Sequence, residues 1–171
     1  MRIAILISGF TRTLLYNIKK TKKIFSKYEC DYYLHISKDD SKDVYCNKKN
    51  TIDNIISCIN PIKCIVENEL KHQNKKYINM RSMWYKIYIL NCLKQKYEKI
   101  NNFKYDLVIR LRPDLFILDD NINFEEYNLD NNIIYGLLDE FNFGNSYSMD
   151  IYSSLFLNFD YLLILDSIKK K

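Results

Sequence analysis

Glycine and proline are scarce in this sequence, with three and two residues among 171. Glycine-rich phosphate loops need glycines at fixed spacings, because only glycine lets the backbone turn tightly against a phosphate. Neither the GxGxxG pattern nor the GxxxxGK(S/T) pattern occurs. The sequence therefore disfavours a dinucleotide-binding protein of the Rossmann type and a P-loop nucleotide hydrolase.

Histidine and paired cysteine are scarce as well. The five cysteines contain no CxxC pair and there are two histidines, so we do not expect a structural zinc site. The apolar run at residues 3–7 is too short for a signal peptide core or a membrane span. Unclustered thiols and the lack of a signal sequence predict a cytoplasmic protein with free cysteines.

Lysine supplies most of the positive charge. The net charge is +5, and lysines gather in short runs at residues 18–23, 48–49, 75–76 and 169–171. Such runs are usually solvated surfaces, and they leave open a peripheral position at an anionic membrane surface. The sequence carries no RRM or KH motif, so we do not expect nucleic acid as a partner.

The composition predicts a folded chain. Hydrophobic residues make up 47% of the sequence, which is enough for one core, and a domain of this length buries roughly 70% of its surface on folding. No internal repeat or linker divides the sequence. We therefore expect a single domain over residues 1–171.

Strand-like and helix-like patterns alternate along the chain. This alternation predicts an α/β fold, with a single three-layer domain and a mainly parallel sheet. Residues 137–144 read as a loop. The expected strands cover residues 2–8, 30–37, 61–67, 105–112 and 132–136, and the expected helices cover 13–28, 51–58, 76–100 and 146–159.

The most informative stretch is YDLVIRLRPDLF at residues 105–116. In a strand, Arg110 and Arg112 point to the same side, and Pro113 then ends the hydrogen-bond ladder just before Asp114. Burying an unpaired guanidinium group costs several kcal/mol. We therefore expect both arginines at the carboxyl end of the strand, facing a cleft that holds a charged ligand.

Open α/β sheets bind ligands beyond the carboxyl ends of their strands. This edge brings together three strand ends, at residues 8–12, 35–38 and 110–114. The guanidinium groups of Arg12, Arg110 and Arg112 are planar forks suited to phosphate or carboxylate. The alternative is a set of structural ion pairs between these arginines and nearby carboxylates, namely Asp106, Asp114 and Asp139.

Three carboxylates are candidates for the chemistry. Asp114 has three open roles, which are metal ligand, acceptor for a sugar hydroxyl, and partner for an arginine. Asp139 and Asp150 are expected within reach of the same cleft, either as the general base that deprotonates an acceptor hydroxyl or as solvated carboxylates. His35 lies inside an apolar strand and is expected to be a core residue rather than a catalytic one.

Four segments together resemble a known family. They are Ser8-Gly9-Phe10-Thr11-Arg12, where relatives tend to show SGQxR, the helical residues 83–87, the strand at 105–114, and residues 141–152. On these segments the chain resembles small glycosyltransferase-like proteins with a GT-A-type nucleotide-sugar fold. Such proteins are encoded in surface-polysaccharide gene clusters of bacteria and in some large DNA viruses.

The resemblance assigns roles to the candidate residues. The DxD motif that grips a divalent ion in GT-A enzymes is replaced here by Arg112-Pro113-Asp114. A metal at Asp114, either Mn²⁺ or Mg²⁺, and metal independence are equally compatible with this change. The resemblance implies that Ser8, Gly9 and Arg12 contact the nucleotide, that Arg110 and Arg112 contact the diphosphate, and that Asp114, Asp139 and Asp150 are the catalytic candidates.

The resemblance also implies a function. We expect a glycosyltransferase that moves a sugar from a nucleotide-diphosphate donor to a glycan or glycolipid acceptor. The alternative is a catalytically degenerate GT-A-like subunit that binds or scaffolds a glycan-assembly complex. The chain ends soon after its last expected helix, which leaves open that a partner glycosyltransferase supplies acceptor-binding elements.

Overall fold

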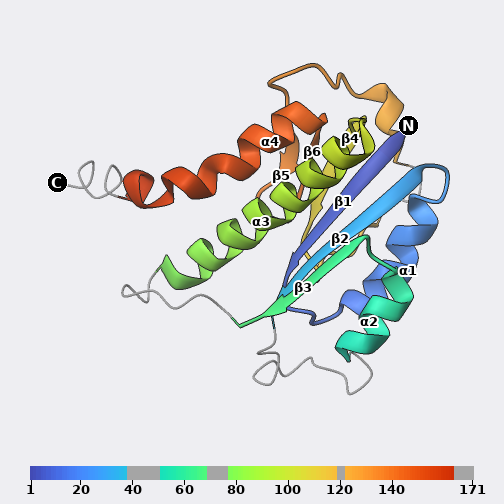
Figure 1. The fold of residues 1–171 in the computed structure, drawn as a ribbon. Helices are drawn as coiled ribbons and strands as arrows, with labels where there is room; N and C mark the ends of the chain where they lie inside the picture. The colour runs from blue at the N-terminus through green and yellow to red at the C-terminus, as the bar shows by residue number, and fades with distance from the viewer. Residues whose placement is uncertain (38–50, 69–76, 119–121, 164–171) are drawn as a thin grey trace.

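The computed structural model describes residues 1–37, 51–68, 77–118 and 122–163, which are organised around one six-stranded sheet (Figure 1). The strands are β1 (Arg2–Gly9), β2 (Glu29–Ser37), β3 (Lys63–Glu67), β4 (Leu107–Leu111), β5 (Tyr135–Leu137) and β6 (Phe141–Gly144). The helices are α1 (Leu14–Ile24), α2 (Ile52–Ile59), α3 (Ile78–Asn101) and α4 (Ser146–Ser154), with 3-10 turns η3 (Phe124–Glu126) and η4 (Leu155–Asn158).

The sheet has the strand order β3-β2-β1-β4-β6-β5. The first four strands in this order are mutually parallel, so their carboxyl ends lie at one edge. Strand β6 is antiparallel to both of its neighbours, β4 and β5. The expected α/β fold with a mainly parallel sheet is confirmed.

Helices cover both faces of the sheet and make three layers (Figure 1). Helices α1 and α2 lie on one face, and α3 and α4 lie on the other. Ile5 and Ile109 pack on the α1 and α2 side, whereas Leu6 and Val108 pack on the α3 and α4 side. Because both faces are buried, β1 and β4 are mostly apolar, as strands in parallel sheets are, and Arg110 is the exception within β4.

Several element boundaries differ from those expected. Helix α1 ends at Ile24 instead of residue 28. Just after its end, the Ser26 hydroxyl donates to the Lys23 carbonyl oxygen at 2.8 Å, in place of a backbone N–H of a continued helix. Strand β3 begins two residues after Pro61, which has no N–H to donate.

Residues 137–144, expected as a loop, contain the turn from β5 into β6. Strand β5 starts later than the expected strand at 132–136. The predicted helix at 146–159 changes to a 3-10 turn at Leu155. The expectation of a loop at 137–144 is therefore wrong, since Phe141–Gly144 forms the strand that pairs with β4.

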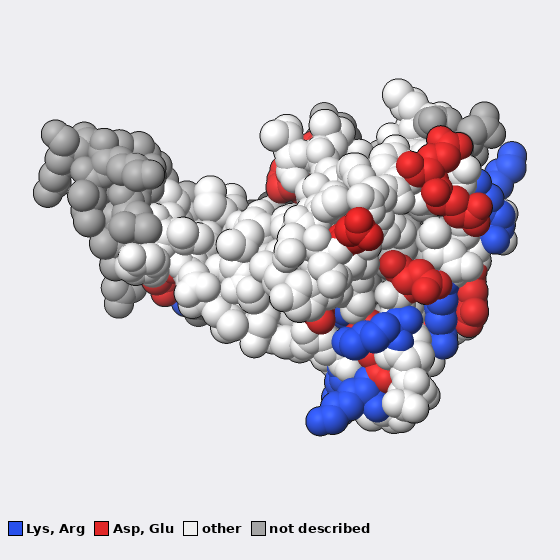
Figure 2. All heavy atoms as spheres, turned by 90° about the horizontal axis from the view of Figure 1, so that it is seen from above, with Lys and Arg blue, Asp and Glu red and all other residues white. Residues whose placement is uncertain are grey.

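Surface charge is mixed on the face seen in Figure 2. Basic and acidic side chains lie next to one another at one end, and much of the remaining surface of that face is uncharged. The lysine runs at 48–49, 75–76 and 169–171 and Cys46 lie outside the described residues, and the other four cysteines are free thiols. Within the described ranges, no helix combines the length and apolar character needed to cross a membrane.

Candidate functional site

A pocket of about 190 Å³ lies at the carboxyl ends of β1 and β4. Six of the residues expected at the site line it, so the ends of β1 and β4 lie together here as expected. Helix α3 supplies the opposite wall. The lining residues are Ser8, Gly9, Phe10, Arg12, Asn79, Met83, Lys86, Arg110, Arg112, Pro113 and Asp114.

The backbone at the end of β1 lies close to the end of β4. Gly9 has φ +133°, and a Cβ atom there would lie 3.4 Å from Pro113 Cδ. A side chain would be strained at this φ, so glycine suits the position. Arg12 follows with φ +28°, and the turn between them carries the Arg12 guanidinium group back to Asp114.

Arg110 is the most unusual residue of the pocket. Its side chain belongs to β4, between Leu6 of β1 and Asn142 of β6 in the strand register, and the residue is 1% exposed. None of its three guanidinium nitrogens has a hydrogen-bond partner among the described residues. Buried polar groups are nearly always hydrogen-bonded in native proteins, so this group is available for a ligand.

The charge of Arg110 persists in this setting. Burial, the largest cause, lowers the pKa of Arg110 from its ordinary value, and the positive charge of Arg112 acts in the same direction. A guanidinium group nevertheless stays protonated in proteins. The buried hydroxyl of Ser8 also lines the pocket and has no partner within the described part of the chain. Both groups favour an anionic, hydrogen-bonding ligand.

Asp114 lies between two arginines at the rim. Its Oδ2 accepts from Arg12 Nη1 at 2.7 Å, and its Oδ1 accepts from Arg112 Nε at 2.6 Å. Burial would raise the pKa of Asp114, but the hydrogen bonds and charges of the two arginines lower it below its ordinary value. The alternative of structural ion pairs with Asp114 is confirmed for Arg12 and Arg112, and not for Arg110.

Lys86 of α3 is a site residue that the sequence argument missed. It is buried, its Nζ donates to Ser37 Oγ, and it lies 5.8 Å from the centre of the Phe10 ring. One signal was available in the sequence. Lys86 is three residues after Met83 and four before Leu90, so helical spacing places it on the core side of α3.

His35 lies near Lys86 and is a core residue, as expected. It is fully buried, and its Nε2 lies 2.7 Å from Glu67 Oε1. Burial is the largest cause that lowers the pKa of His35, and the charge of Lys86 adds to it against the opposing effect of Glu67. His35 does not line the pocket.

Asp139 lies at the boundary between this pocket and a second hollow. Its side chain is 45% exposed and its Oδ2 is 3.5 Å from Arg112 Nη1. The second hollow, of about 700 Å³, shares Asn79 and Met83 with the first pocket and is otherwise mostly apolar. Its lining residues are Asn79, Met80, Met83, Trp84, Leu138, Asp139, Tyr152 and Leu155.

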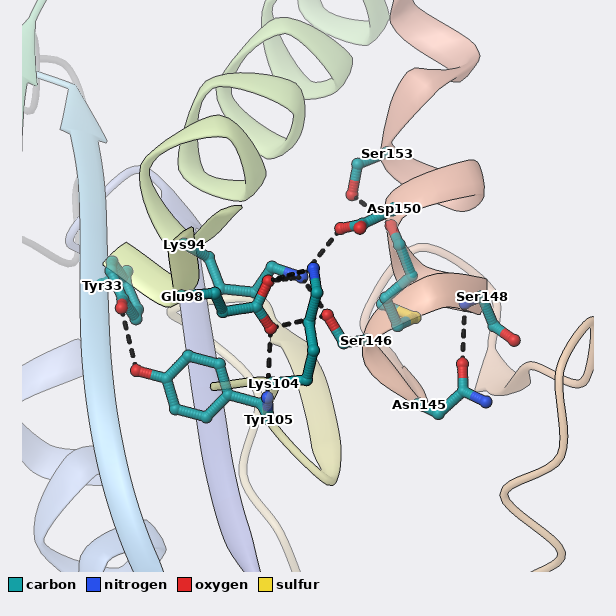
Figure 3. A network of polar contacts seen from close by, with 11 residues as sticks. Tyr33, Lys94, Glu98, Lys104, Tyr105, Asn145, Ser146, Ser148, Asp150 and Ser153 are labelled. Atoms are coloured by element: carbon teal, nitrogen blue, oxygen red, sulfur yellow. Dashed lines mark hydrogen bonds and ion pairs between the residues drawn. The ribbon is translucent and has the colours of Figure 1, made fainter. Parts of the chain in front are cut away.

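Asp150 does not lie in the pocket, contrary to expectation. Its Oδ1 accepts from Lys94 Nζ at 2.7 Å in a separate polar network (Figure 3). Lys94 is eight residues beyond Lys86 on α3, which is about 12 Å along the helix axis. The physical reason is the path of α4, which turns this carboxylate toward the carboxyl-terminal half of α3.

The network around Asp150 joins three elements and has its hydrogen bonds satisfied (Figure 3). Glu98 is buried and accepts from Ser146 Oγ at 2.7 Å, from Lys104 Nζ at 2.8 Å and from the Tyr105 backbone N–H at 3.1 Å. Lys94 Nζ also donates to Ser146 Oγ at 2.6 Å. These contacts tie α3 to α4 and to the start of β4, which is a structural role.

The ionisation of Glu98 makes the stability of the folded protein depend on pH. Burial would raise the pKa of Glu98, but hydrogen bonds from Lys104 and Ser146 and the charge of Lys94 lower it below its ordinary value of 4.5. A carboxyl group with a lowered folded pKa stabilises the protein above its unfolded pKa, and this stabilisation is lost as the pH falls through the folded pKa.

We therefore expect the free energy of unfolding to decline below pH ~4.5, with a shallower decline in Glu98→Gln. Urea unfolding across a pH series measures both slopes. Glu125→Gln, at an exposed position, is the matched control and should keep the wild-type slope. Equal slopes for wild type and Glu98→Gln would contradict this assignment.

The residues of the pocket do not fit a divalent cation. Both oxygens of Asp114 are bonded to guanidinium groups, and no second carboxylate of the described residues lines the pocket. Across residues 1–37, 51–68, 77–118 and 122–163, no group of three or more His, Cys, Asp or Glu side chains is placed to hold a metal ion.

The chain was also compared with known proteins. No protein-family model matches it, and no curated protein matches it significantly. The functional argument is therefore carried by the residues and the geometry of the site itself.

Proposed function

We propose that the chain is a glycosyltransferase that binds the diphosphate of a nucleotide sugar in the pocket formed by β1, β4 and α3. The observation that carries this proposal is the buried guanidinium group of Arg110, which lines the pocket without a hydrogen-bond partner among the described residues. The position of the pocket supports it, because open α/β sheets bind nucleotides beyond the carboxyl ends of their strands.

The number of cationic groups favours a diphosphate over a carboxylate. Of the residues that the structure describes, four cations and one carboxylate line the pocket, namely Arg12, Lys86, Arg110, Arg112 and Asp114. One guanidinium fork is enough for a carboxylate, whereas a diphosphate offers several oxygens to groups that approach from different elements. The resemblance of residues 8–12 and 105–114 to nucleotide-sugar enzymes points to the same ligand.

The second hollow suits the acceptor. It opens beside the anion pocket, and the rings of Trp84 and Tyr152, whose centres are 5.1 Å apart, form part of its wall. Asp139 is half exposed at the boundary between the two spaces. A carboxylate in that place is able to accept the proton of an acceptor hydroxyl, so Asp139 is the general base of this proposal.

The second candidate function is a degenerate binding or scaffold subunit. The observation in its favour is that Arg12 and Arg112 bond to the two oxygens of Asp114, and in the described part of the chain no other carboxylate lines the pocket. Such a subunit would bind a nucleotide sugar without transferring or hydrolysing it. Transfer activity therefore separates the two functions.

Thermal unfolding in the presence of a panel of UDP-, GDP- and dTDP-sugars tests the proposal. A ligand at about 100 times its Kd stabilises by about 2.7 kcal/mol, which raises Tm by roughly 5–11 °C for a domain of this size. We expect one class of nucleotide to give such a shift, and Arg112→Ala to abolish it.

Arg81→Ala is the matched control, since Arg81 pairs with Asp160 and does not line the pocket. It should keep the full shift. The absence of a shift with every nucleotide sugar would contradict the proposed function. A shift without release or transfer of the sugar would favour the scaffold subunit.

A further inference from the structure

We infer that this pocket binds a diphosphate through its cationic side chains alone, with no divalent cation, and that Asp114 is a positioning residue for Arg12 and Arg112 rather than a metal ligand. The inference rests on the proposed function for the nature of the ligand. It goes beyond that function because it names the group that neutralises the diphosphate, a choice that the Arg112-Pro113-Asp114 sequence leaves open.

The charge of the pocket is the first argument. Among the described residues, four cationic side chains and one carboxylate line it. Asp139 and Glu140 lie 3.5 and 3.3 Å from the Arg112 guanidinium at its edge, and the balance of these groups remains positive. A divalent cation placed here would be repelled by the arginines, and these carboxylates already pair with Arg112. Mg²⁺ sites in proteins normally use one or two carboxylates that are free to coordinate.

The geometry of Asp114 is the second argument. Its two oxygens accept from Arg12 Nη1 at 2.7 Å and from Arg112 Nε at 2.6 Å, and Arg112 Nη2 approaches Oδ2 at 3.3 Å. A metal ion at Asp114 would displace these donors and lie directly beside two positive charges. The contacts instead hold both guanidinium groups at the rim of the pocket, where their orientation is fixed before a ligand arrives.

Arg110 provides the third argument, because it supplies what a metal would otherwise supply. Its guanidinium group is a fixed positive charge in a buried place, and the N–H groups of its three nitrogens have no partner in the described part of the chain. A planar fork of this kind binds phosphate oxygens in a bidentate manner. Its charge acts with little screening, since the residue is 1% exposed.

Isothermal titration of the full chain with UDP and with inorganic pyrophosphate tests the inference. Each titration is done in EDTA and again with Mn²⁺ in excess over the probe. We expect the two Kd values for each probe to agree within about threefold, because the arginines do not need the ion. A larger tightening by Mn²⁺ would overturn the inference, and so would the absence of binding to both probes in EDTA.

Three variants identify the groups responsible. Arg110→Met should weaken binding in EDTA by at least about 100-fold, in line with the loss of a buried charge-assisted bidentate contact. Asp114→Asn should weaken binding by the same factor in EDTA and in Mn²⁺. Arg81→Met, away from the pocket, should bind as wild type. If Asp114→Asn weakened binding in Mn²⁺ alone, Asp114 would be a metal ligand and the inference would fail.

The outcomes also separate this inference from the proposed function. If pyrophosphate and UDP bind in EDTA but no sugar is transferred, the cation-free pocket stands and the glycosyltransferase proposal fails. If sugar transfer is observed and binding of UDP requires Mn²⁺, the proposed function stands and this inference fails.

Discussion

Replacing Arg110 with methionine should make the free protein more stable and leave the pocket unable to bind a diphosphate. The expected gain is about 2 kcal/mol, in the range found when buried ionic groups are replaced by apolar side chains of similar volume. For a domain of this length it corresponds to a rise in Tm of roughly 4–8 °C. Both effects follow from one property, the absence of a partner for the Arg110 guanidinium among the described residues.

The physical reason is the cost of desolvation. A guanidinium group taken from water loses its hydration, and the loss is recovered only where carboxylates or carbonyl oxygens accept its N–H groups. Arg110 is buried, and no described residue accepts from its guanidinium group. Methionine is unbranched, flexible and uncharged, and although it is shorter than arginine it occupies most of the space at the end of β4 without this cost. Binding residues commonly carry such a penalty, because function requires them.

Thermal unfolding of the ligand-free variant measures the effect, and Arg81→Met is the matched control. Arg81 forms an ion pair with Asp160, which is largely exposed, and such pairs contribute about 0–1 kcal/mol. Its loss should therefore leave Tm nearly unchanged. If Arg110→Met instead lowered Tm by several degrees, Arg110 would have a structural partner, and the argument for a ligand would lose its basis.

Replacing Lys94 with methionine should have the opposite effect, a loss of about 3–5 kcal/mol of stability, as when one partner of a buried ion pair is removed. Lys94 and Glu98 are both 0% exposed in their side chains. Lys94 Nζ lies 2.7 Å from Asp150 Oδ1 and 3.4 Å from Glu98 Oε2. Without Lys94, the negative charge of Glu98 stays buried with Lys104 as its remaining ion-pair partner.

Chemical denaturation of Lys94→Met tests this, with Lys96→Met as the control. Lys96 is exposed on the same helix, so its replacement should change stability by no more than about 0.5 kcal/mol. The loss for Lys94→Met corresponds to a fall in Tm of roughly 6–20 °C. A change similar to that of Lys96→Met would show that the network in Figure 3 does not hold α4 to α3.

The parts of the fold that depend on local patterns could be predicted from the sequence. Strand β1 has a continuous apolar run at residues 3–7 and β4 is apolar apart from Arg110, which indicates burial on both faces, and Pro113 marks the end of β4. The carboxyl ends of parallel strands share one edge, so Ser8, Arg12 and Arg112 could be expected together. Most of the residues that line the pocket could be expected in this way, and so could Asp114 as a partner of Arg12 and Arg112, whereas the burial of Arg110 without a partner among the described residues could not.

The parts that depend on tertiary pairing could not be predicted. Strand β6 has four residues and follows Asp139 and Glu140, which are typical of a loop. It is a strand because its backbone pairs with Val108 to Leu111 of β4. The turn between β5 and β6 also places Asp139 next to Arg112, while no described residue accepts from Arg110. The local sequence pattern does not predict this arrangement.

Asp150 was misplaced for a related reason. The pattern of α4 shows which of its residues face the core, but the position of α4 along α3 depends on packing. The sequence did contain one clue, because Lys94 lies on the core side of α3 and Glu98 follows it by four residues. A buried lysine needs carboxylate partners from another element, and Asp150 is one of them.

The most direct test of the central claim is a crystal structure of the protein with the nucleoside diphosphate that gives the largest thermal shift, grown in EDTA. We predict that the diphosphate lies in the pocket between β1, β4 and α3, with phosphate oxygens about 2.7–2.9 Å from the guanidinium nitrogens of Arg110. A diphosphate bound elsewhere on the molecule, or an Arg110 guanidinium still without a partner in the complex, would contradict the account.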